Sequence, residues 1–117
     1  MENRIIRIEN GVVSVPDRVE MSIAEIADMF GIYYRTAKQH IRSIEKSGVV
    51  DGDYTTSCSV EGLTIHPDYY ELEMIIAVAF RVQSAKAEIF RRHIMRKVVR
   101  HDVVATLILP LQNSMFN

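Results

Sequence analysis

The stretch MSIAEIADMFGIYYRTAKQHIRSIEKSGVV, residues 21–50, decides how this chain of 117 residues folds. It predicts two short amphipathic helices joined by a turn at Gly31, because glycine adopts positive φ without steric cost. The second helix, over Tyr34–Lys46, carries all four Lys and Arg residues of the stretch. Two helices in this order are typical of a helix-turn-helix, which lays its second helix in the major groove of DNA.

Local signals fix the ends and the inner faces of both helices. Ser22 and Glu25 have the spacing of a capping box, which satisfies orphan N–H groups of the first turn. Gly48 is well placed to end the second helix. The apolar residues that we expect to face inward recur at helical spacing. They are Ile23, Ile26, Ala27 and Phe30 in the first helix, Ile32 in the turn, and Ala37, Ile41 and Ile44 in the second helix.

The outward side chains of the second helix belong to types that read DNA. Arg pairs with guanine, Gln with adenine, and Lys or Tyr with phosphates. We expect Arg35, Lys38 and Gln39 to face the groove, with Gln39 and one basic residue contacting bases. The other residues of the set would bind phosphates and fix the register. The predicted DNA-binding residues are Tyr33, Tyr34, Arg35, Thr36, Lys38, Gln39 and Arg42.

The charge of the chain is sorted along the sequence, although the net charge is only -1. Residues 31–50 hold four basic residues against Glu45 alone, and residues 81–100 hold seven against Glu88 alone. Residues 51–80 contain six acids and no Lys or Arg. A nearly neutral protein whose positive charge is gathered on one face can still bind a polyanion.

Composition bounds the class of protein. The length fits one domain, residues 1–117, and 48% hydrophobic with 25% charged residues is ordinary for a soluble globular chain. Cys58 is the only cysteine, so we expect no internal disulfide and a reducing, cytoplasmic location. The N-terminus lacks a signal-peptide pattern, and no apolar run is long enough to span a membrane. We expect no metal and no cofactor.

Two β-hairpins flank the helical stretch. In residues 5–15, isoleucines precede and valines follow Asn10-Gly11, the pair that favours a type I′ turn. After the second helix, Tyr54–Val60, a turn at Glu61-Gly62 and Leu63–His66 form a second predicted hairpin, ended by Pro67. A hairpin in this position is the layout of a wing. It carries Glu61 and no Lys or Arg, so a structural role is favoured over contact with DNA.

The C-terminal third predicts two more helices. The first is short, almost wholly apolar and buried, and includes Leu72, Ile75, Ile76, Val78, Ala79 and Phe80. The second runs from Ala85, after Ser84 as a possible N-cap, to about His101. Its predicted apolar stripe consists of Ile89, Phe90, Ile94, Val98 and Met95. Its basic residues either form a solvated face or make secondary contacts with the DNA backbone, and those considered are Arg91, Arg92, Arg96 and Lys97.

The end of the chain is apolar. Val103–Leu109 is β-prone and too hydrophobic to remain exposed, so we expect it to pack on the domain or on a second subunit. A homodimer would suit paired DNA half-sites. The predicted fold is α+β: a winged helix-turn-helix-like domain with an N-terminal hairpin, a second hairpin and a C-terminal helical pair. Its parts are the helix-turn-helix core (21–48), the helical part (70–101) and the apolar tail (102–117).

The chain resembles the N-terminal part of RhuM-like proteins of bacterial genomes and mobile elements. The matching stretches are IIRIENGVVSV, MSIAEIADMFGIYYRTAKQHIRSI and YYELEMIIAVAFRVQSAKAEIFRRHIMRKV, which cover most of residues 5–98. Phe80 replaces the usual Tyr before Arg81, Ala79 replaces a Gly, and His93 stands where a Trp is common. The resemblance implies a bacterial DNA-binding protein without established catalytic activity, and it supplies no catalytic residue to map.

Two other classes of function were weighed against DNA binding. An enzyme is disfavoured because the chain has no nucleophile elbow, phosphate loop or clustered carboxylates. The candidate chemical residues are scattered in the sequence: His40, His66, His93, His101, Asp68 and Cys58. The main alternative is a protein-interaction module of a mobile element or phage-derived system with the same fold, in which Tyr33 and Tyr34 would contact the partner. The preferred hypothesis is transcription regulation through binding of double-stranded DNA.

Overall fold

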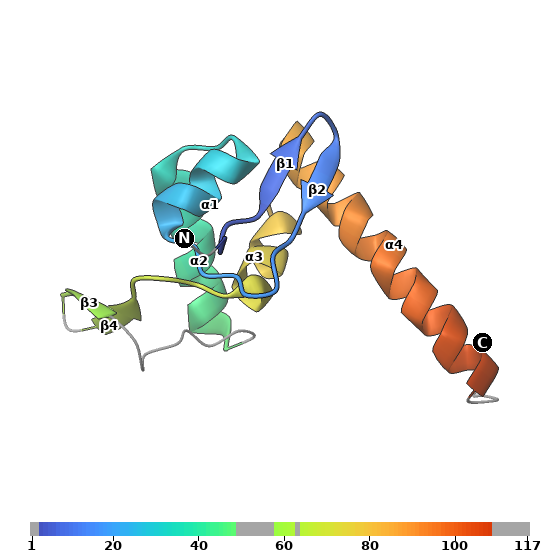
Figure 1. The fold of residues 1–117 in the computed structure, drawn as a ribbon. Coiled ribbons are helices and arrows are strands. Elements are labelled where there is room, and N and C mark those ends of the chain that lie inside the picture. Colours follow the sequence, from blue (N-terminus) through green and yellow to red (C-terminus); the bar gives the residue numbers. More distant parts are fainter. Residues whose placement is uncertain (1–2, 49–57, 63, 109–117) are drawn as a thin grey trace.

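The computed structural model describes residues 3–48, 58–62 and 64–108, and these residues form an α+β fold (Figure 1). The elements in chain order are β1 (Arg7–Glu9), β2 (Val12–Ser14), α1 (Ile23–Phe30), α2 (Tyr34–Ser47), β3 (Cys58–Glu61), β4 (Thr64–Pro67), α3 (Leu72–Ala79) and α4 (Ala85–Ile108). Helices α1, α2 and α3 lie together, the β1–β2 hairpin packs on α4, and α4 projects away from the rest (Figure 1).

The N-terminal hairpin forms as predicted. β1 and β2 are antiparallel, with Glu9 opposite Val12 and Arg7 opposite Ser14. Asn10 and Gly11 lie between them with φ of 52° and 76°. Positive φ at both central residues is the signature of a type I′ turn, whose twist matches that of the flanking strands.

The core lies where α1, α2, α3 and the start of α4 meet. Phe30 from α1 and Phe90 from α4 are fully buried, and their rings meet edge to face with centroids 5.8 Å apart. The predicted inner face of α2 is confirmed, because Ala37, Ile41 and Ile44 are completely buried. This burial fixes the rotation of α2 about its axis and therefore decides which of its side chains face outward.

A short β-bridge joins the segment before α1 to the segment before α3. The backbone N–H groups of Met21 and Tyr70 each donate to the other's carbonyl oxygen, at 2.9 and 2.8 Å. Both side chains are buried. The bridge holds the start of α1 beside Tyr70, whose hydroxyl reaches α2.

The second hairpin is antiparallel, and its turn lies one residue later than predicted. Glu61 belongs to β3 and faces Thr64 of β4, so the turn begins at Gly62, which has a φ of 63°. Pro67 is the last residue of β4. The first part of the predicted strand, residues 54–57, lies outside the described residues.

The C-terminal helices differ from the prediction at their ends. Phe80 caps α3 and is exposed, although we expected it to be buried with that helix. The predicted end of α4 near His101 and the predicted β-character of the tail are wrong up to Ile108, because α4 continues to that residue. No glycine or proline occurs between Ala85 and Leu109, so nothing in the local sequence stops the helix before Pro110. Residues 109–117 lie outside the described part of the chain.

Candidate nucleic-acid interface

The turn between α1 and α2 is built by Gly31. Its φ of 68° is left-handed, and its backbone N–H points to the carbonyl oxygens of Ala27 and Asp28, which end α1. The N–H of Ile32 donates to the same Ala27 carbonyl at 3.0 Å. Because the N–H groups of Gly31 and Ile32 satisfy the last carbonyls of α1, the chain can turn within a few residues and begin α2 at Tyr34.

The start of α1 is fixed by the predicted capping box. The N–H of Glu25 donates to the Ser22 hydroxyl at 3.2 Å, and the N–H of Ser22 donates to the Glu25 carboxylate at 2.9 Å. Arg4 adds two donors to that carboxylate, at 3.0 and 3.1 Å, and also donates to the carbonyl of Glu20. The sequence did not indicate Arg4, because the residues that it binds are distant along the chain.

The outer face of α2 carries Arg35, Gln39 and Lys46. All three are exposed, and they lie opposite the buried residues of the helix. Their spacing of four and seven residues places them along one stripe. This stripe offers two positive charges and one amide on a helix side that no other described element covers.

Aromatic side chains stand at the beginning of α2. Tyr33 is the N-cap residue and is 84% exposed, while Tyr34 is exposed to a lesser degree. Thr36 is half-buried. The predicted phosphate-binding tyrosines therefore lie at the N-terminal end of the helix, where its dipole favours negative charge.

Arg42 faces the protein as much as solvent. Its Nη1 donates to the Tyr70 hydroxyl at 2.9 Å and lies 3.4 Å from Oε1 of Glu45, and only 23% of the side chain is exposed. Burial raises the pKa of Tyr70 to about 12, helped by the Glu45 carboxylate and opposed by the hydrogen bond from Arg42. Arg42 was predicted to bind phosphate, but these contacts also give it a structural role within the protein.

Glu45 links α2 to the second hairpin. Its Oε1 lies 3.1 Å from Nδ1 of His66 in β4, and both side chains are about nine-tenths buried. Its Oε2 is buried with no hydrogen-bond partner among the described residues. His66 is thereby a residue that positions the hairpin against α2.

A groove of about 330 Å³ separates α2 from the hairpin and the start of α1. Lys38, which is half-buried and already engaged within the protein, lines it together with Arg42, Tyr34, Val60 and Asp68. Lys38 and Arg42 thus lie on the flank of α2 that faces the hairpin. They are set apart from the outer stripe formed by Arg35, Gln39 and Lys46.

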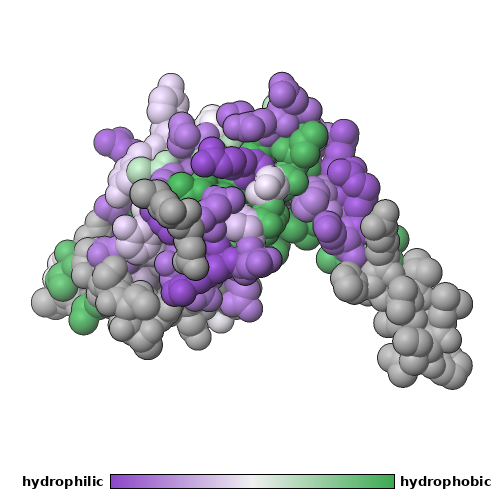
Figure 2. Space-filling view, viewed as in Figure 1, coloured by the Kyte–Doolittle hydropathy of each residue, from purple (hydrophilic) through white to green (hydrophobic). Residues whose placement is uncertain are grey.

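The hairpin itself presents apolar side chains. Val60 and Ile65 are cross-strand neighbours, and both are exposed. Hydrophobic atoms accordingly gather over β3 and β4 in the space-filling view (Figure 2). The hairpin's lack of Lys and Arg remains consistent with the predicted structural role.

Arg81 is a basic residue that the sequence did not place near α2. It lies in the turn after α3, is exposed, and donates from Nη1 to the hydroxyl of Ser43 at 3.0 Å. Ser43 is also exposed and belongs to α2. The arrangement adds a third positive charge beside the outer face of α2.

The basic residues of α4 divide into two groups. Arg91 is half-buried and donates to the carbonyls of Ala79 and Val82, at 2.7 and 2.8 Å, so it caps the end of α3. Arg92 pairs with Glu88 at 2.7 Å on the surface. Arg96 and Lys97 are exposed. Arg91 was one of the four residues considered as secondary contacts with the DNA backbone. Its side chain instead binds backbone carbonyls at the end of α3.

His93 lies beside this basic group. Burial lowers its pKa, and the charges of Lys97 and Arg96 lower it further. A lowered pKa favours the neutral form of this histidine.

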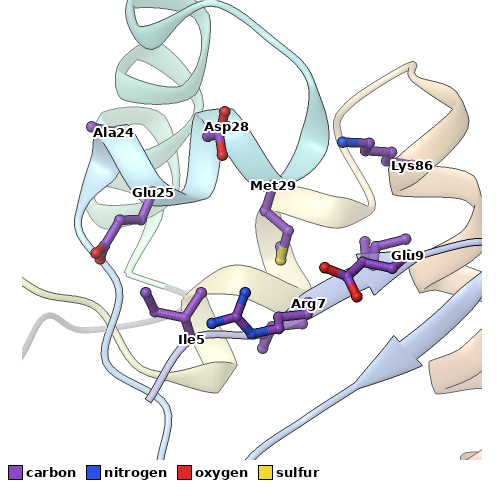
Figure 3. A pocket seen from close by; sticks show the side chains of 10 residues that line it. Ile5, Arg7, Glu9, Ala24, Glu25, Asp28, Met29 and Lys86 are labelled. Carbon is purple, nitrogen blue, oxygen red and sulfur yellow. The ribbon is translucent and has the colours of Figure 1, made fainter. Parts of the chain in front are cut away.

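A second groove, of about 460 Å³, runs between β1 and α1 (Figure 3). Arg7, Glu9, Asp28 and Lys86 line it with charges of both signs. A polyanion would meet repulsion as well as attraction there, so this groove is a poor nucleic-acid site. Within the described residues, no three His, Cys, Asp or Glu side chains gather to hold a metal ion, and no helix is long and apolar enough to cross a membrane.

Comparison of the chain with models of protein families, with curated proteins and with solved structures finds no match. The resemblance to RhuM-like proteins therefore stays a prediction, and a function must be inferred from the geometry of the chain.

Proposed function

We propose that this protein is a sequence-specific DNA-binding regulator that inserts α2 into the major groove. The observation that carries the proposal is the outer stripe of α2, where Arg35, Gln39 and Lys46 are exposed opposite a fully buried inner face. The tight turn at Gly31 supports a helix-turn-helix arrangement of α1 and α2. In that arrangement the β3–β4 hairpin is the wing.

The stripe divides into base-reading and phosphate-binding groups. Arg35 and Gln39 are one helical turn apart near the N-terminal half of α2, the part of a recognition helix that contacts bases. A guanidinium can bind guanine in bidentate fashion, and an amide can bind adenine. Lys46 near the end of α2 and Arg81 beside Ser43 suit phosphates, as do Tyr33 and Tyr34 at the start of the helix.

The wing in this proposal supports α2 rather than binding DNA. Its described side chains offer the apolar pair Val60 and Ile65 to solvent, and His66 contacts Glu45 of α2. Arg42 likewise holds α2 to Tyr70. We therefore remove Arg42 from the residues expected to dominate DNA affinity, and keep Arg35 and Gln39.

The test is DNA binding by fluorescence anisotropy at several salt concentrations. Wild type should bind duplex DNA with a steep negative log–log salt slope, because bound cations displace counterions. Arg35→Ala/Gln39→Ala should lose affinity for selected sequences, at about 1–3 kcal/mol for each bidentate contact. Arg7→Ala, which removes the same single charge from exposed β1, is the matched control and should bind nearly as wild type. Absence of binding by wild type at low salt would refute the proposal.

One observation favours the alternative, a protein-docking module. Tyr33 is 84% exposed, and tyrosine is enriched in binding hot spots. That function predicts a partner whose affinity falls sharply with Tyr33→Ala and hardly changes with salt. The same pair of variants, Tyr33→Ala and Arg35→Ala/Gln39→Ala, therefore separates the two functions.

A further inference from the structure

The distal part of α4 extends beyond the body of the protein as an arm (Figure 1). The helix packs on the core through Ala87 and Phe90, which are completely buried, and then through Ile94, which is half-buried. Immediately after Ile94, the side chains become exposed on every side. The arm is the part of α4 from Met95 to Ile108.

The arm is apolar on one side. Met95, Val98 and Val99 are exposed by 47%, 43% and 52%, and we call these three residues the arm stripe. At 100° per residue they occupy one continuous sector that begins next to Ile94. Val98, one turn after Ile94, prolongs the core-facing side of α4 into solvent, and Met95 and Val99 widen the apolar sector around the helix. Met95 and Val98 belong to the predicted apolar stripe of this helix, and in the single chain they are not covered.

The basic residues lie on the opposite side of the same helix. Arg96, His93 and Lys97 fill the sector across from the arm stripe, by the same 100° rotation. Arg92 borders the stripe beside Val99, and its guanidinium pairs with Glu88 at 2.7 Å. Arg91 lies within the apolar sector, but it turns back to the carbonyls of α3. A partner that covers the stripe would thus leave the charged side of the arm in water.

A helical arm of this kind needs a packing partner. Fourteen residues from 95 to 108 span about 21 Å, and isolated helices of this length are marginal in water. The sequence of the arm includes Val98, Val99, Val103, Val104 and Ile108, and β-branched residues lower helix propensity. Tertiary or quaternary packing of the apolar side is what normally stabilises such a helix.

We propose that the arm stripe is the contact surface between two copies of this chain, so that α4 pairs with α4 of a second copy. Two stripes are chemically self-complementary, because each presents a thioether and two valines to the same groups on its partner. The like charges of Arg96 and Lys97 lie on the far sides of the helices and stay solvated, while Arg91 and Arg92, nearer the stripe, are held by the carbonyls of Ala79 and Val82 and by Glu88. This pairing does not depend on DNA.

The test is the mass of the full chain in solution by sedimentation equilibrium over a wide range of concentration. Wild type should approach twice 13.4 kDa, and Val98→Asp should shift the chain to 13.4 kDa. Lys97→Gln changes the charge by the same single unit on the basic side, and it should remain dimeric. A wild type that stays at 13.4 kDa throughout would overturn the proposal and assign the stripe to a different partner. A dimer that Val98→Asp leaves intact would overturn it as well.

A second measurement guards against unfolding of the aspartate variant. Val98→Cys in a Cys58→Ser background should form an interchain disulfide rapidly on mild oxidation, because equivalent stripe residues lie near each other in the pair. Lys97→Cys in the same background should crosslink much more slowly. Equal rates for the two variants would contradict the pairing. Since both experiments omit DNA, their failure leaves the proposed DNA binding untouched.

Discussion

The guanidinium of Arg42 donates a hydrogen bond to the hydroxyl of Tyr70 at 2.9 Å. This bond joins the middle of α2 to the segment before α3 that forms the β-bridge with Met21. Glu45 lies on the other side of the guanidinium, and His66 lies beyond Glu45. Tyr70, Arg42, Glu45 and His66 thus form one chain of polar contacts that runs from the segment before α3, through α2, to the β3–β4 hairpin. Its effect is to hold the proposed recognition helix against the β3–β4 hairpin.

We predict that Arg42 contributes to stability more than to DNA affinity. Tyr70→Phe removes one hydrogen bond and should lower the free energy of unfolding by about 0.5–1.5 kcal/mol. Arg42→Met should lower the free energy of unfolding by roughly 1–3 kcal/mol. It removes the hydrogen-bond donor to the Tyr70 hydroxyl and the positive charge beside the Glu45 carboxylate. Urea denaturation measures both. Arg35→Ala, on the outer stripe, should change stability by no more than about 0.5 kcal/mol. An Arg42→Met protein of normal stability that no longer binds DNA would show that Arg42 is a direct contact.

A parallel prediction separates Arg91 from Arg92, its neighbour in α4. Arg91→Ala should destabilise the fold by roughly 1.5–3 kcal/mol, because charged hydrogen bonds to the carbonyls of Ala79 and Val82 are lost. Arg92→Ala removes an equal charge from an exposed pair and should cost under about 0.5 kcal/mol. Thermal or urea unfolding of the two variants side by side is the measurement. Equal losses would mean that Arg91 does not cap α3 in solution.

These arginines mark the boundary of what the sequence could predict. The capping box at Ser22, the turn at Gly31 and the inner face of α2 depend on residues a few positions apart, and all three predictions are confirmed. Arg42 meets Tyr70 across 28 positions, and Arg81 meets Ser43 across 38. Periodicity carries no information about such pairs, so Arg42 was placed among the predicted DNA contacts and Arg91 among the possible secondary ones.

The length of α4 was missed for a different reason. Val103–Leu109 has β-branched residues and reads as a strand when taken alone. It follows directly on an established helix, however, and adding a residue to an existing helix costs far less than starting one. The strand propensity of this segment was therefore outweighed by extension of the helix that precedes it, and α4 continues to Ile108.

The third prediction concerns acid stability and the carboxylate of Glu25. Burial raises the pKa of this group, but the hydrogen bonds from Arg4 and Ser22 together lower it by more than burial raises it. The pKa in the folded state therefore lies below the ordinary 4.5. A lowered pKa means that the folded state holds the charged form more strongly. Its contribution to stability is present above about 4.5 and is lost as the pH falls through the folded pKa.

Glu25→Gln should therefore lower stability at neutral pH by about 1 kcal/mol and flatten its decline in acid. Urea denaturation at a series of pH values between about 6 and 3 measures the effect. Arg4→Gln should flatten the same region, because the carboxylate then loses its two guanidinium donors. If Glu25→Gln kept the slope of wild type, other carboxylates would have to account for the acid dependence.

The last prediction concerns Arg81 as part of the proposed DNA interface. Its hydrogen bond to Ser43 holds a positive charge beside α2 at a point where the helix itself offers only a hydroxyl. If α2 lies in the major groove, this charge is placed to meet a phosphate at the groove edge. Arg81→Ala should then reduce the log–log salt slope of DNA binding by about 1 and weaken all sequences alike. Arg35→Ala should instead relax the preference for particular bases, because its proposed contact is to a base edge.

Ser43→Ala is the control for this pair, because it removes the acceptor but keeps the guanidinium. It should leave the salt slope of wild type nearly unchanged, with a small loss of affinity as Arg81 becomes less restrained. Anisotropy titrations of the three variants on one duplex and on a scrambled duplex give all the required values. A wild-type slope for Arg81→Ala, in a protein that does bind DNA, would place Arg81 outside the interface. It would also restrict the contact to α2, since Arg81 is the basic residue that another element brings beside the described outer face of that helix.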